Sequence, residues 1–300
     1  MAGTSKMAAL AAAGVAAGAL AGAAAVKAQQ WYCLQVLKTR GGIARVHMVS
    51  GADGEPVRVL QEGGVFQSAT YLGSRWAEPA FAYYRAFDAM FAGETALGHP
   101  IRRVLMIGGG GFAYPKHLLT TRAGVHMDVA EFDPAIVRTA RHWFYLDELE
   151  ARLANPATAR GNSLRVIVED GRTFLEDQAG PIAADRSRAY DAIVNDAFSG
   201  REPARVIATV EAAHAVRACL APAGLYLENV VSRDAGRDVS FLRDRVATMR
   251  EVFAHVHVLQ TSDAEFGGED NYLVIATDGD AAFEGTIAYD DDFPGTPLRD

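Results

Sequence analysis

The sequence predicts an α/β protein with a mostly parallel, Rossmann-like sheet, which ends in an antiparallel hairpin and follows a small antiparallel β domain. Three observations lead to this prediction. Apolar β-type runs alternate with helical patterns between residues 104 and 253, as in parallel sheets covered by helices on both faces. Four consecutive glycines, at 108–111, follow the first of these strands. The last two β runs have no helix between them.

Size and composition fit one globular unit with a small additional domain. The chain has 300 residues, of which 50% are hydrophobic and 22% charged, enough for one large core. The formal net charge of -8 argues against nucleic acid as a partner, because neutralising phosphates requires clustered Lys and Arg. Cys33 and Cys219 lie far apart with no second ligand at metal spacing, so we expect neither a disulfide framework nor a metal site.

We divide the chain into four segments. Residues 1–30 form an Ala-rich apolar segment, residues 31–76 a small β domain, residues 77–278 the main α/β domain and residues 279–300 an acidic tail. The tail contains three consecutive aspartates, at 290–292, so we expect it to be a solvated end.

The amino-terminal segment contains an unbroken apolar run at 7–26, long enough to cross a bilayer. Twelve of its twenty residues are Ala and three are Gly, which gain little in hydrocarbon. Three interpretations stay open: a membrane anchor, a signal peptide cleaved near Ala28, and a loosely ordered soluble helix. If the run spans a membrane, the basic residues after it outnumber Lys6, which favours a cytoplasmic position for the folded part.

The region before the main domain predicts a small sheet and one helix. Short β-type runs at 43–49, 57–60 and 65–67 are separated by Gly-containing turns, which is typical of an antiparallel meander. Residues 78–91 then show aromatic and apolar side chains at helical spacing. We expect this stripe to pack in the core.

The main domain alternates strands and helices. Asp133 and Pro134 mark a helix start, with the aspartate as cap and the proline in the first turn. We expect polar surface loops at 154–162 and 179–189. The predicted strands are 104–107, 125–131, 164–168, 190–195 and 225–230, and the predicted helices are 114–121, 134–145, 171–178, one within 203–220, and 239–253.

The end of the main domain separates two kinds of Rossmann-like sheet. The β runs at 256–260 and 272–276 follow each other without a helix, so they predict an antiparallel hairpin at one edge of the sheet. Class I methyltransferase-like domains end in this way, whereas dehydrogenase domains keep the alternation. The hairpin therefore argues against an NAD oxidoreductase.

A nucleoside site is predicted where the first two strands of the main sheet end. Glycines at 108–111 let backbone N–H groups approach a ligand, and Glu131, at the end of the next strand, can accept both hydroxyl hydrogens of a ribose. Gly108, Gly110 and Ala113 also satisfy the loose dinucleotide pattern, so an NAD site stays an alternative. A glycine turn without any ligand is another.

Two further acids follow strands at the same edge. Asp170 could accept a hydrogen bond from an adenine amino group or simply cap the helix that begins at Gly171. Asp196 follows a strongly apolar strand at the carboxyl edge, where open sheets bind ligands, so we expect it in the site. Asp191 begins the same strand and is therefore expected to be structural.

In order and spacing, several motifs between residues 43 and 276 resemble the spermidine synthase (aminopropyltransferase) family. The resemblance implies a class I methyltransferase-like fold, a homodimer, and transfer of an aminopropyl group from decarboxylated S-adenosylmethionine to an amine such as putrescine, without a metal. The motifs are residues 60–67, 81–83, 104–110, 131–133, 169–171 and 190–196.

The same resemblance implies roles for individual residues. Asp196 would hold and help to deprotonate the attacking amine, while Tyr83 and Tyr84 would contact the substrate. The residues implied to hold the nucleoside are Gln67, Gly108, Gly109, Gly110, Glu131, Asp170 and Gly171.

The chain departs from the family at three positions that carry acids there: Gly111, Ser199 and Arg85. We expect these changes to remove negative charge from the region where an ammonium group would sit, and burying a cation without carboxylate partners is costly. Three functional hypotheses follow: an aminopropyltransferase-like enzyme, an S-adenosylmethionine-dependent methyltransferase, and a non-catalytic nucleoside-binding protein.

Overall fold

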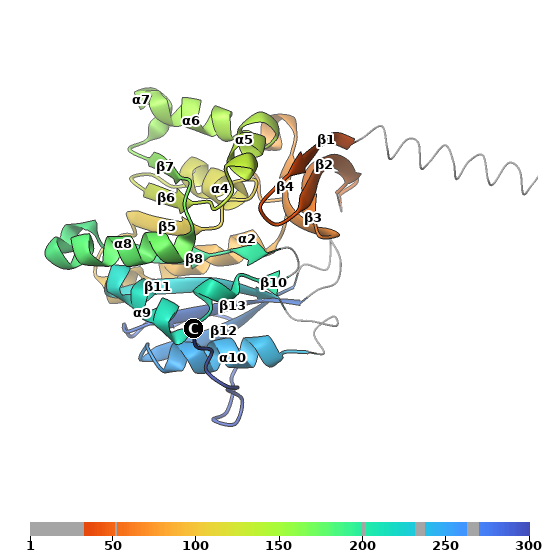
Figure 1. Cartoon of the computed structure of the whole chain (residues 1–300). Helices are drawn as coiled ribbons and strands as arrows, with labels where there is room; N and C mark the ends of the chain where they lie inside the picture. Colours follow the sequence, from red (N-terminus) through yellow and green to blue (C-terminus); the bar gives the residue numbers. More distant parts are fainter. Residues whose placement is uncertain (1–32, 52, 200–201, 232–237, 263–269) are drawn as a thin grey trace, which may run out of the picture.

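A computed structural model describes residues 33–51, 53–199, 202–231, 238–262 and 270–300. A small antiparallel sheet lies beside a large sheet that has helices on both faces (Figure 1). The predicted apolar run at 7–26 lies outside the described residues. Within the described ranges, no helix combines the length and apolar character needed to span a bilayer.

The small sheet has four strands in the order β1-β2-β3-β4, and every neighbouring pair is antiparallel. The predicted meander is thus present, with one additional strand at its start. Gly63 and Gly64, both with positive φ, form the tight turn between β3 and β4. The strands are β1 (Cys33–Lys38), β2 (Ile43–Ser50), β3 (Pro56–Glu62) and β4 (Val65–Tyr71).

The single helix predicted at 78–91 is wrong. The chain forms instead a short helix α2 (Tyr83–Ala86), a 3-10 segment η2 (Phe87–Gly93) and a second short helix α3 (Glu94–Leu97). Phe81, Tyr84, Phe87 and Met90 are all buried and recur every three residues. A 3-10 helix has three residues per turn, so it keeps Phe87 and Met90 on one face more closely than an α-helix does.

The main sheet has seven strands in the order β12-β13-β11-β8-β5-β6-β7. Within this sheet, β13 runs opposite to the other six strands, which confirms the predicted closing hairpin and the class I methyltransferase-like fold. The strands are β5 (Arg103–Ile107), β6 (His126–Ala130), β7 (Ser163–Ile167), β8 (Tyr190–Asn195), β11 (Leu220–Val231), β12 (His255–Ser262) and β13 (Asp270–Thr277), with a separate two-stranded sheet of β9 (Phe198–Ser199) and β10 (Glu202–Pro203).

Two predicted surface loops contain helices. Residues 156–159 form α7 within the first, and α8 continues through most of the second. Buried Ile182 lies on α8 beyond the predicted helix end and packs in the same cluster as Phe174 and Leu175. The helices are α4 (Ala113–Thr121), α5 (Pro134–Trp143), α6 (Leu146–Ala154), α7 (Pro156–Ala159), α8 (Gly171–Ala184), α9 (Val210–Cys219) and α10 (Ser240–Arg250).

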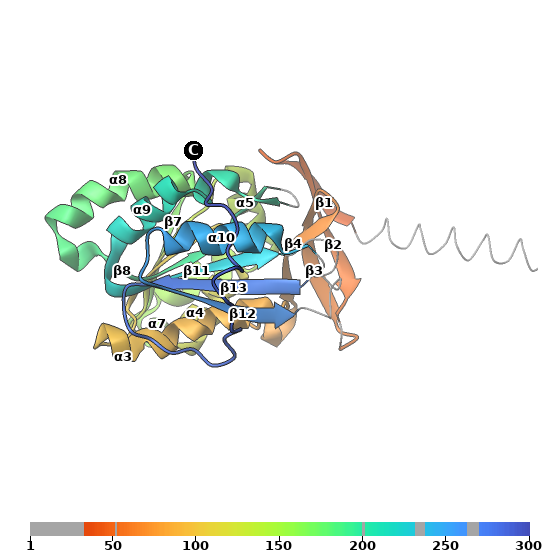
Figure 2. The ribbon, with the colours of Figure 1, turned by 90° about the horizontal axis from the view of Figure 1, so that it is seen from below.

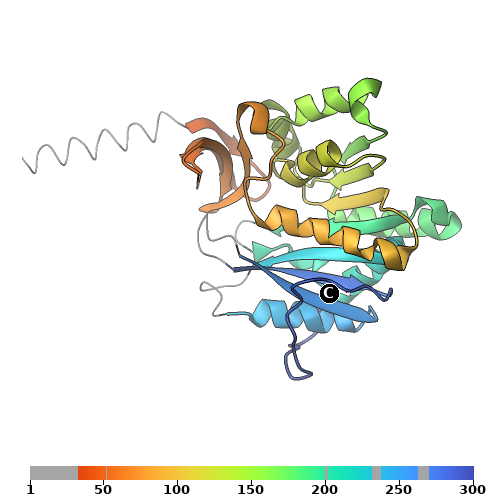
Figure 3. The same cartoon turned by 180° about the vertical axis from the view of Figure 1, so that it is seen from behind.

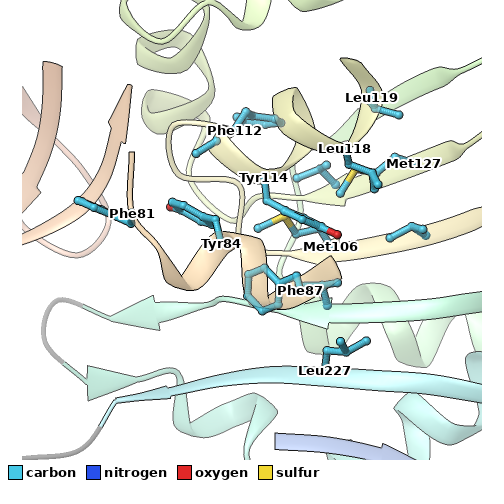
Figure 4. Packing of buried hydrophobic residues seen from close by; sticks show 14 of the residues in the cluster. Phe81, Tyr84, Phe87, Met106, Phe112, Tyr114, Leu118, Leu119, Met127 and Leu227 are labelled. Atoms are coloured by element: carbon cyan, nitrogen blue, oxygen red, sulfur yellow. The ribbon is translucent and has the colours of Figure 1, made fainter. Parts of the chain in front are cut away.

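Core residues form clusters on both faces of the main sheet. On one face the rings of Phe87 and Tyr114 pack edge to face at 5.1 Å, beside Met106 and Leu227 (Figure 4). The other face packs against α8, α9 and α10. A third, smaller cluster joins the small sheet to α5, through Leu37, Ala44, Val46, Leu60, Ile136 and Phe144.

The parallel strands of the main sheet all run towards one end of that sheet. The small sheet lies at this end. In Figure 2 the arrows of β11 and β12 point at β1–β4, and Figure 3 shows the same arrangement from behind. Residues that follow the parallel strands therefore face the small sheet.

The tail at 279–300 runs along the surface of the molecule, and its three aspartates, at 290–292, are exposed, as predicted for a solvated end. Ile287 N donates to Val258 O, and Val210 N donates to Leu298 O. The tail passes α10 and ends near α8 and α9 (Figure 2). Its last side chain, Asp300, binds Arg172 at 2.9 Å. Backbone and side-chain contacts thus hold a segment whose composition suggested only solvation.

Candidate active site

A cavity of about 1030 Å³ lies between the small sheet and the carboxyl ends of the parallel strands. It is large enough for a nucleoside with an attached side chain. The small sheet contributes residues from the β1–β2 turn and from β4, and the main domain contributes the turns after β5, β6, β7 and β8. All of the predicted site residues line this cavity: Gln67, Tyr83, Tyr84, Gly108, Gly109, Gly110, Glu131, Asp170, Gly171 and Asp196.

The glycine turn after β5 depends on the absence of side chains. Gly108 has φ +88°, and a Cβ there would lie 2.7 Å from the carbonyl oxygen of Asp196. Gly110 has φ +49°, in the left-handed region that favours glycine. The turn therefore brings bare backbone to the cavity wall directly beside Asp196.

Glu131, after β6, holds this turn in place. Its Oε2 accepts hydrogen bonds from Gly109 N at 2.9 Å and Gly110 N at 3.1 Å, and its Oε1 accepts one from Asp133 N at 2.8 Å. Burial raises the pKa of this carboxyl group, while the three N–H donors oppose that rise. Since each carboxylate oxygen has two lone pairs, only Oε1 keeps a free acceptor position for a ligand hydroxyl.

The β1–β2 turn of the small sheet covers the residues after Glu131. Asp133 caps α5 as predicted, because its Oδ1 accepts from Ala135 N at 2.7 Å. Its Oδ2 accepts from the backbone N of Arg40, whose guanidinium lies 4.2 Å from the centre of the Phe132 ring. The small sheet thus forms one wall of the cavity.

Asp170 and Gly171 join α8 to the cavity. The helix-cap role of Asp170 is confirmed, since its Oδ1 accepts from Thr173 N at 3.0 Å. A Cβ at Gly171 would lie 2.3 Å from Ile107 Cγ2, so this glycine lets α8 begin directly against β5. The contact of Asp170 with an adenine stays a prediction.

Asp196 is the acid with the most unusual surroundings. Asn229 Nδ2 donates to its Oδ1 at 2.9 Å, and the Tyr83 hydroxyl donates to its Oδ2 at 3.2 Å. Burial raises the pKa of Asp196 to about 7, although both hydrogen bonds lower it. A carboxyl group with this pKa can exchange a proton near neutral pH, which suits an acid or base in catalysis.

Tyr83 and Tyr84 lie together beside Asp196, with ring centres 4.3 Å apart. The Tyr84 hydroxyl lies 3.4 Å from the hydroxyl of buried Ser68 in β4. Burial and the Asp196 carboxylate hold the pKa of Tyr83 well above its usual value, so its phenol stays protonated and acts as a donor.

Two of the three family departures lie outside the cavity lining. Gly111 is buried, and a Cβ there would lie 2.6 Å from Ser68 Oγ and 2.8 Å from Phe144 Cδ1. Arg85 is exposed and does not line the cavity. The expectation that these two positions remove charge from the cavity wall is therefore wrong. The side chain of Ser199 lies outside the described part of the chain.

Asn229 and Asn271 line the cavity but were not predicted. Asn229 follows Glu228 on the otherwise apolar strand β11, and polar residues near the carboxyl end of a buried strand are the signal that could have found it.

Other polar groups have structural positions. Asp191 accepts from Arg102 N and Arg103 N at 2.8 and 2.9 Å, which confirms the structural role predicted for it. Across the described residues, no cluster of three or more His, Cys, Asp or Glu side chains is arranged to hold a metal ion.

No protein-family model matches the sequence. Two curated relatives are polyamine aminopropyltransferases. The chain is 26% identical to the one from Vibrio vulnificus over 155 residues, which are 52% of this chain and 44% of that protein. It is 30% identical to polyamine aminopropyltransferase 2 of Hyperthermus butylicus over 148 residues, which are 46% of this chain and 44% of that protein. The matches thus span less than half of each relative.

A solved structure of a probable spermidine synthase from Corynebacterium glutamicum is similar in fold. Its TM-score is 0.58 at 22% identity, with 81% of this chain and 80% of that chain covered. At this identity the likeness shows the fold alone. The curated relatives, together with this shared fold, confirm the resemblance to the spermidine synthase family that the sequence motifs indicated.

Proposed function

We propose that the chain is a transferase of the aminopropyltransferase type, which binds an adenosyl-sulfonium donor and transfers its aminopropyl group to an amine. One observation carries the proposal. Half-buried Asp196 presents its carboxyl group to the cavity beside the glycine turn, where Asn229 and Tyr83 bind it and its pKa is raised to about 7. The similarity to polyamine aminopropyltransferases supports the same reaction class.

The proposed nucleoside site is the part of the cavity around the glycine turn. Gly108, Gly109 and Gly110 would let the ligand approach the backbone, and Glu131 Oε1 would accept one ribose hydroxyl hydrogen. Asp170 would face the adenine end. Gln67 and Gly171 also line the cavity and complete the proposed contacts.

The sulfonium of the donor supplies an activated carbon. In the proposed step, the lone pair of a neutral amine nitrogen forms a bond to the aminopropyl carbon next to sulfur. The C–S bond breaks, and its electrons stay on sulfur as the neutral thioether of methylthioadenosine. The proton that the new ammonium loses passes to the Asp196 carboxylate, which is deprotonated above about pH 7.

The residues of this chain supply orientation and a dry surrounding for that step. Tyr83 and Asn229 each bind one oxygen of Asp196, so the carboxylate has a fixed position from which to hold the amine. The aromatic side chains of Phe66, Phe81 and Phe198 also line the cavity and exclude water from it.

Calorimetric titration tests the donor. We expect the purified protein to bind methylthioadenosine and decarboxylated S-adenosylmethionine, and binding of NAD alone would refute the proposal. Stronger binding of S-adenosylmethionine, with methyl transfer to an amine, would favour the methyltransferase hypothesis instead.

Product analysis tests the reaction. Incubation with decarboxylated S-adenosylmethionine and putrescine should release methylthioadenosine, and Asp196→Asn should lower the rate by at least about 100-fold. Asp147→Asn, which changes an exposed carboxylate on α6, is the matched control and should leave the rate unchanged. Binding without product would favour the non-catalytic hypothesis.

We also propose that the protein forms a homodimer, and that residues 7–26 attach it to a membrane with the folded part in the cytoplasm. Light scattering measures the molar mass and so the homodimer. Cell fractionation with and without residues 1–28 measures the membrane attachment. A monomer, or an unchanged distribution after the deletion, would contradict the respective proposal.

A further inference from the structure

One wall of the cavity is built from the chain between β8 and α9, of which the structure describes residues 196–199 and 202–208. It begins with Asp196, passes through β9 and β10, and returns through η4 (Arg205–Ile207). Ala197 and Phe198 near its start and residues 204–207 near its end line the cavity. Whatever fixes the two ends of this segment therefore fixes both Asp196 and this wall of the cavity.

Asn195 holds the start of the segment. It is 3% exposed, and its Oδ1 accepts from Ala197 N at 3.2 Å. Its Nδ2 donates to the Tyr226 hydroxyl at 2.9 Å and to Glu228 Oε1 at 3.3 Å. Both acceptors lie on β11, which pairs with β8 in parallel.

Arg245 of α10 holds the end of the segment. Its guanidinium is fully buried and donates to the backbone oxygen of Ala208. Its Nε and Nη2 donate to Glu228 Oε2 at 3.0 and 2.7 Å. Glu228, which is 1% exposed, is thus shared between Asn195 at one end of the segment and Arg245 at the other.

Net stability does not explain why an ion pair occupies this place. Removing two charges from water costs several kcal/mol for each ion, and well-packed apolar side chains are often at least as stable there. An apolar pair makes no directional hydrogen bonds. A carboxylate and a guanidinium do, and they impose a fixed hydrogen-bond geometry on their partners. Here those partners are the two ends of the segment that carries Asp196.

We infer that Glu228 and Arg245 are positioning residues, which hold the described residues 196–199 and 202–208 at both ends and so keep Asp196 in its position against Tyr83 and Asn229. The kinetic part of this inference rests on the proposed function, whereas the position of Asp196 does not. The pair lies on the α10 face of β11, and Asn229, the next residue, contacts Asp196 from the opposite face.

A double variant separates positioning from folding. Glu228→Leu with Arg245→Met replaces the pair by apolar side chains of similar size and should preserve the fold. The pKa of Asp196 is followed by carbon NMR of its carboxyl group, identified by its absence in Asp196→Asn. We expect this pKa to fall by at least about one pH unit, because the carboxylate becomes more exposed to water when the segment loosens.

The kinetics should change with the same variant. We expect kcat to fall at least about tenfold, while KM for the donor and the affinity for methylthioadenosine stay within about twofold. The matched control is Tyr190→Phe, which removes the hydrogen bond to Asp128 at the other end of β8. The control should leave the Asp196 pKa and kcat unchanged.

A folded double variant whose Asp196 pKa and kcat equal those of the wild type would overturn the inference. If the double variant does not fold, Asn195→Ala is used instead, because it removes the Asn195 hydrogen bonds at the start of the segment and leaves the ion pair intact. The same fall in the Asp196 pKa is then expected, and an unchanged value would overturn the inference. Since the NMR titration needs no substrate, failure of the proposed reaction would leave this test in force.

Discussion

At the scale of single residues, the proposed function depends on the protonation of Asp196. Its folded pKa of about 7 lies above the ordinary value of 3.8, because burial disfavours the charged form. A carboxyl group with a raised pKa stabilises the fold less as pH rises from about 4 to about 7. The charged form that the proposed reaction needs is therefore the form that folding opposes, as is typical of a catalytic group.

The hydroxyl of Tyr83 should set the pH at which Asp196 ionises. Its hydrogen bond lowers the Asp196 pKa, so Tyr83→Phe should raise that pKa and move the acid limb of the activity profile to higher pH. We expect the Asp196 pKa to rise by about half a pH unit to one pH unit. Initial rates between pH 5 and 9 measure it.

Tyr114→Phe is the control for this change, because Tyr114 is a buried phenol that donates to Asp88 instead. Its acid limb should match that of the wild type. A Tyr83→Phe limb at the wild-type position, or at lower pH, would contradict the role given to Tyr83.

Residues at strand ends could be predicted from sequence, because parallel strands bring their carboxyl ends to one edge. Glu131, Asp170 and Asp196 were found in this way. Partners that meet through tertiary packing could not: Glu228 lies on β11 and Arg245 on α10, and the sequence does not reveal which side chain of each element faces the other. Gly111 was misinterpreted for the same reason, since its buried neighbours come from β4 and the end of α5.

At the scale of elements, the contact between α4 and β4 contains a buried lysine. Lys116 Nζ donates to Thr70 Oγ1 at 2.8 Å, and burial lowers the lysine pKa to about 7, with Arg58 adding repulsion. Because the folded pKa lies below the unfolded one, this group destabilises the fold increasingly as pH falls from about 10 to about 7.

Lys116→Met should therefore stabilise the protein at pH 7 by a few kcal/mol, and by less at pH 10. Urea unfolding at the two pH values measures the difference. Lys38→Met, which changes an exposed lysine of β1, serves as the control and should have a small effect at both. An equal stabilisation by Lys116→Met at pH 7 and 10 would contradict this account.

Gly111, where the related family has an acid, tests the packing between the glycine turn and β4. Gly111→Asp should lower the free energy of unfolding by about 2–4 kcal/mol, because its Cβ meets Ser68 and Phe144. Gly180→Asp in α8 is the control, since a Cβ there meets nothing within 4 Å. Thermal unfolding compares the stabilities of the two variants. A Gly111→Asp variant as stable as the Gly180→Asp control would contradict this prediction and show that the glycine turn can rearrange.

At the scale of the whole molecule, the sequence predicts the strands and helices of the main sheet. It does not predict the contacts that pack the tail and the small sheet against that sheet. The alternation of strands and helices and the closing hairpin predicted the seven-stranded sheet that the structure contains. The tail at 279–300 has no periodic pattern, and single contacts such as those of Leu298 and Asp300 hold it, so its composition predicted the exposure of its aspartates but not these contacts. The small sheet completes the cavity by lying over the strand ends, an arrangement set by apolar contacts such as Leu60 with Ile136 and Phe144.

The proposed function depends on Asp196 accepting, inside this cavity, the proton that the attacking amine loses. The most direct test is a single-turnover measurement of methylthioadenosine release from decarboxylated S-adenosylmethionine and putrescine between pH 5 and 9. We expect a rate that rises with an apparent pKa near 7 and is lost in Asp196→Asn. A rate independent of pH across this range, or an Asp196→Asn variant as fast as the wild type, would contradict it.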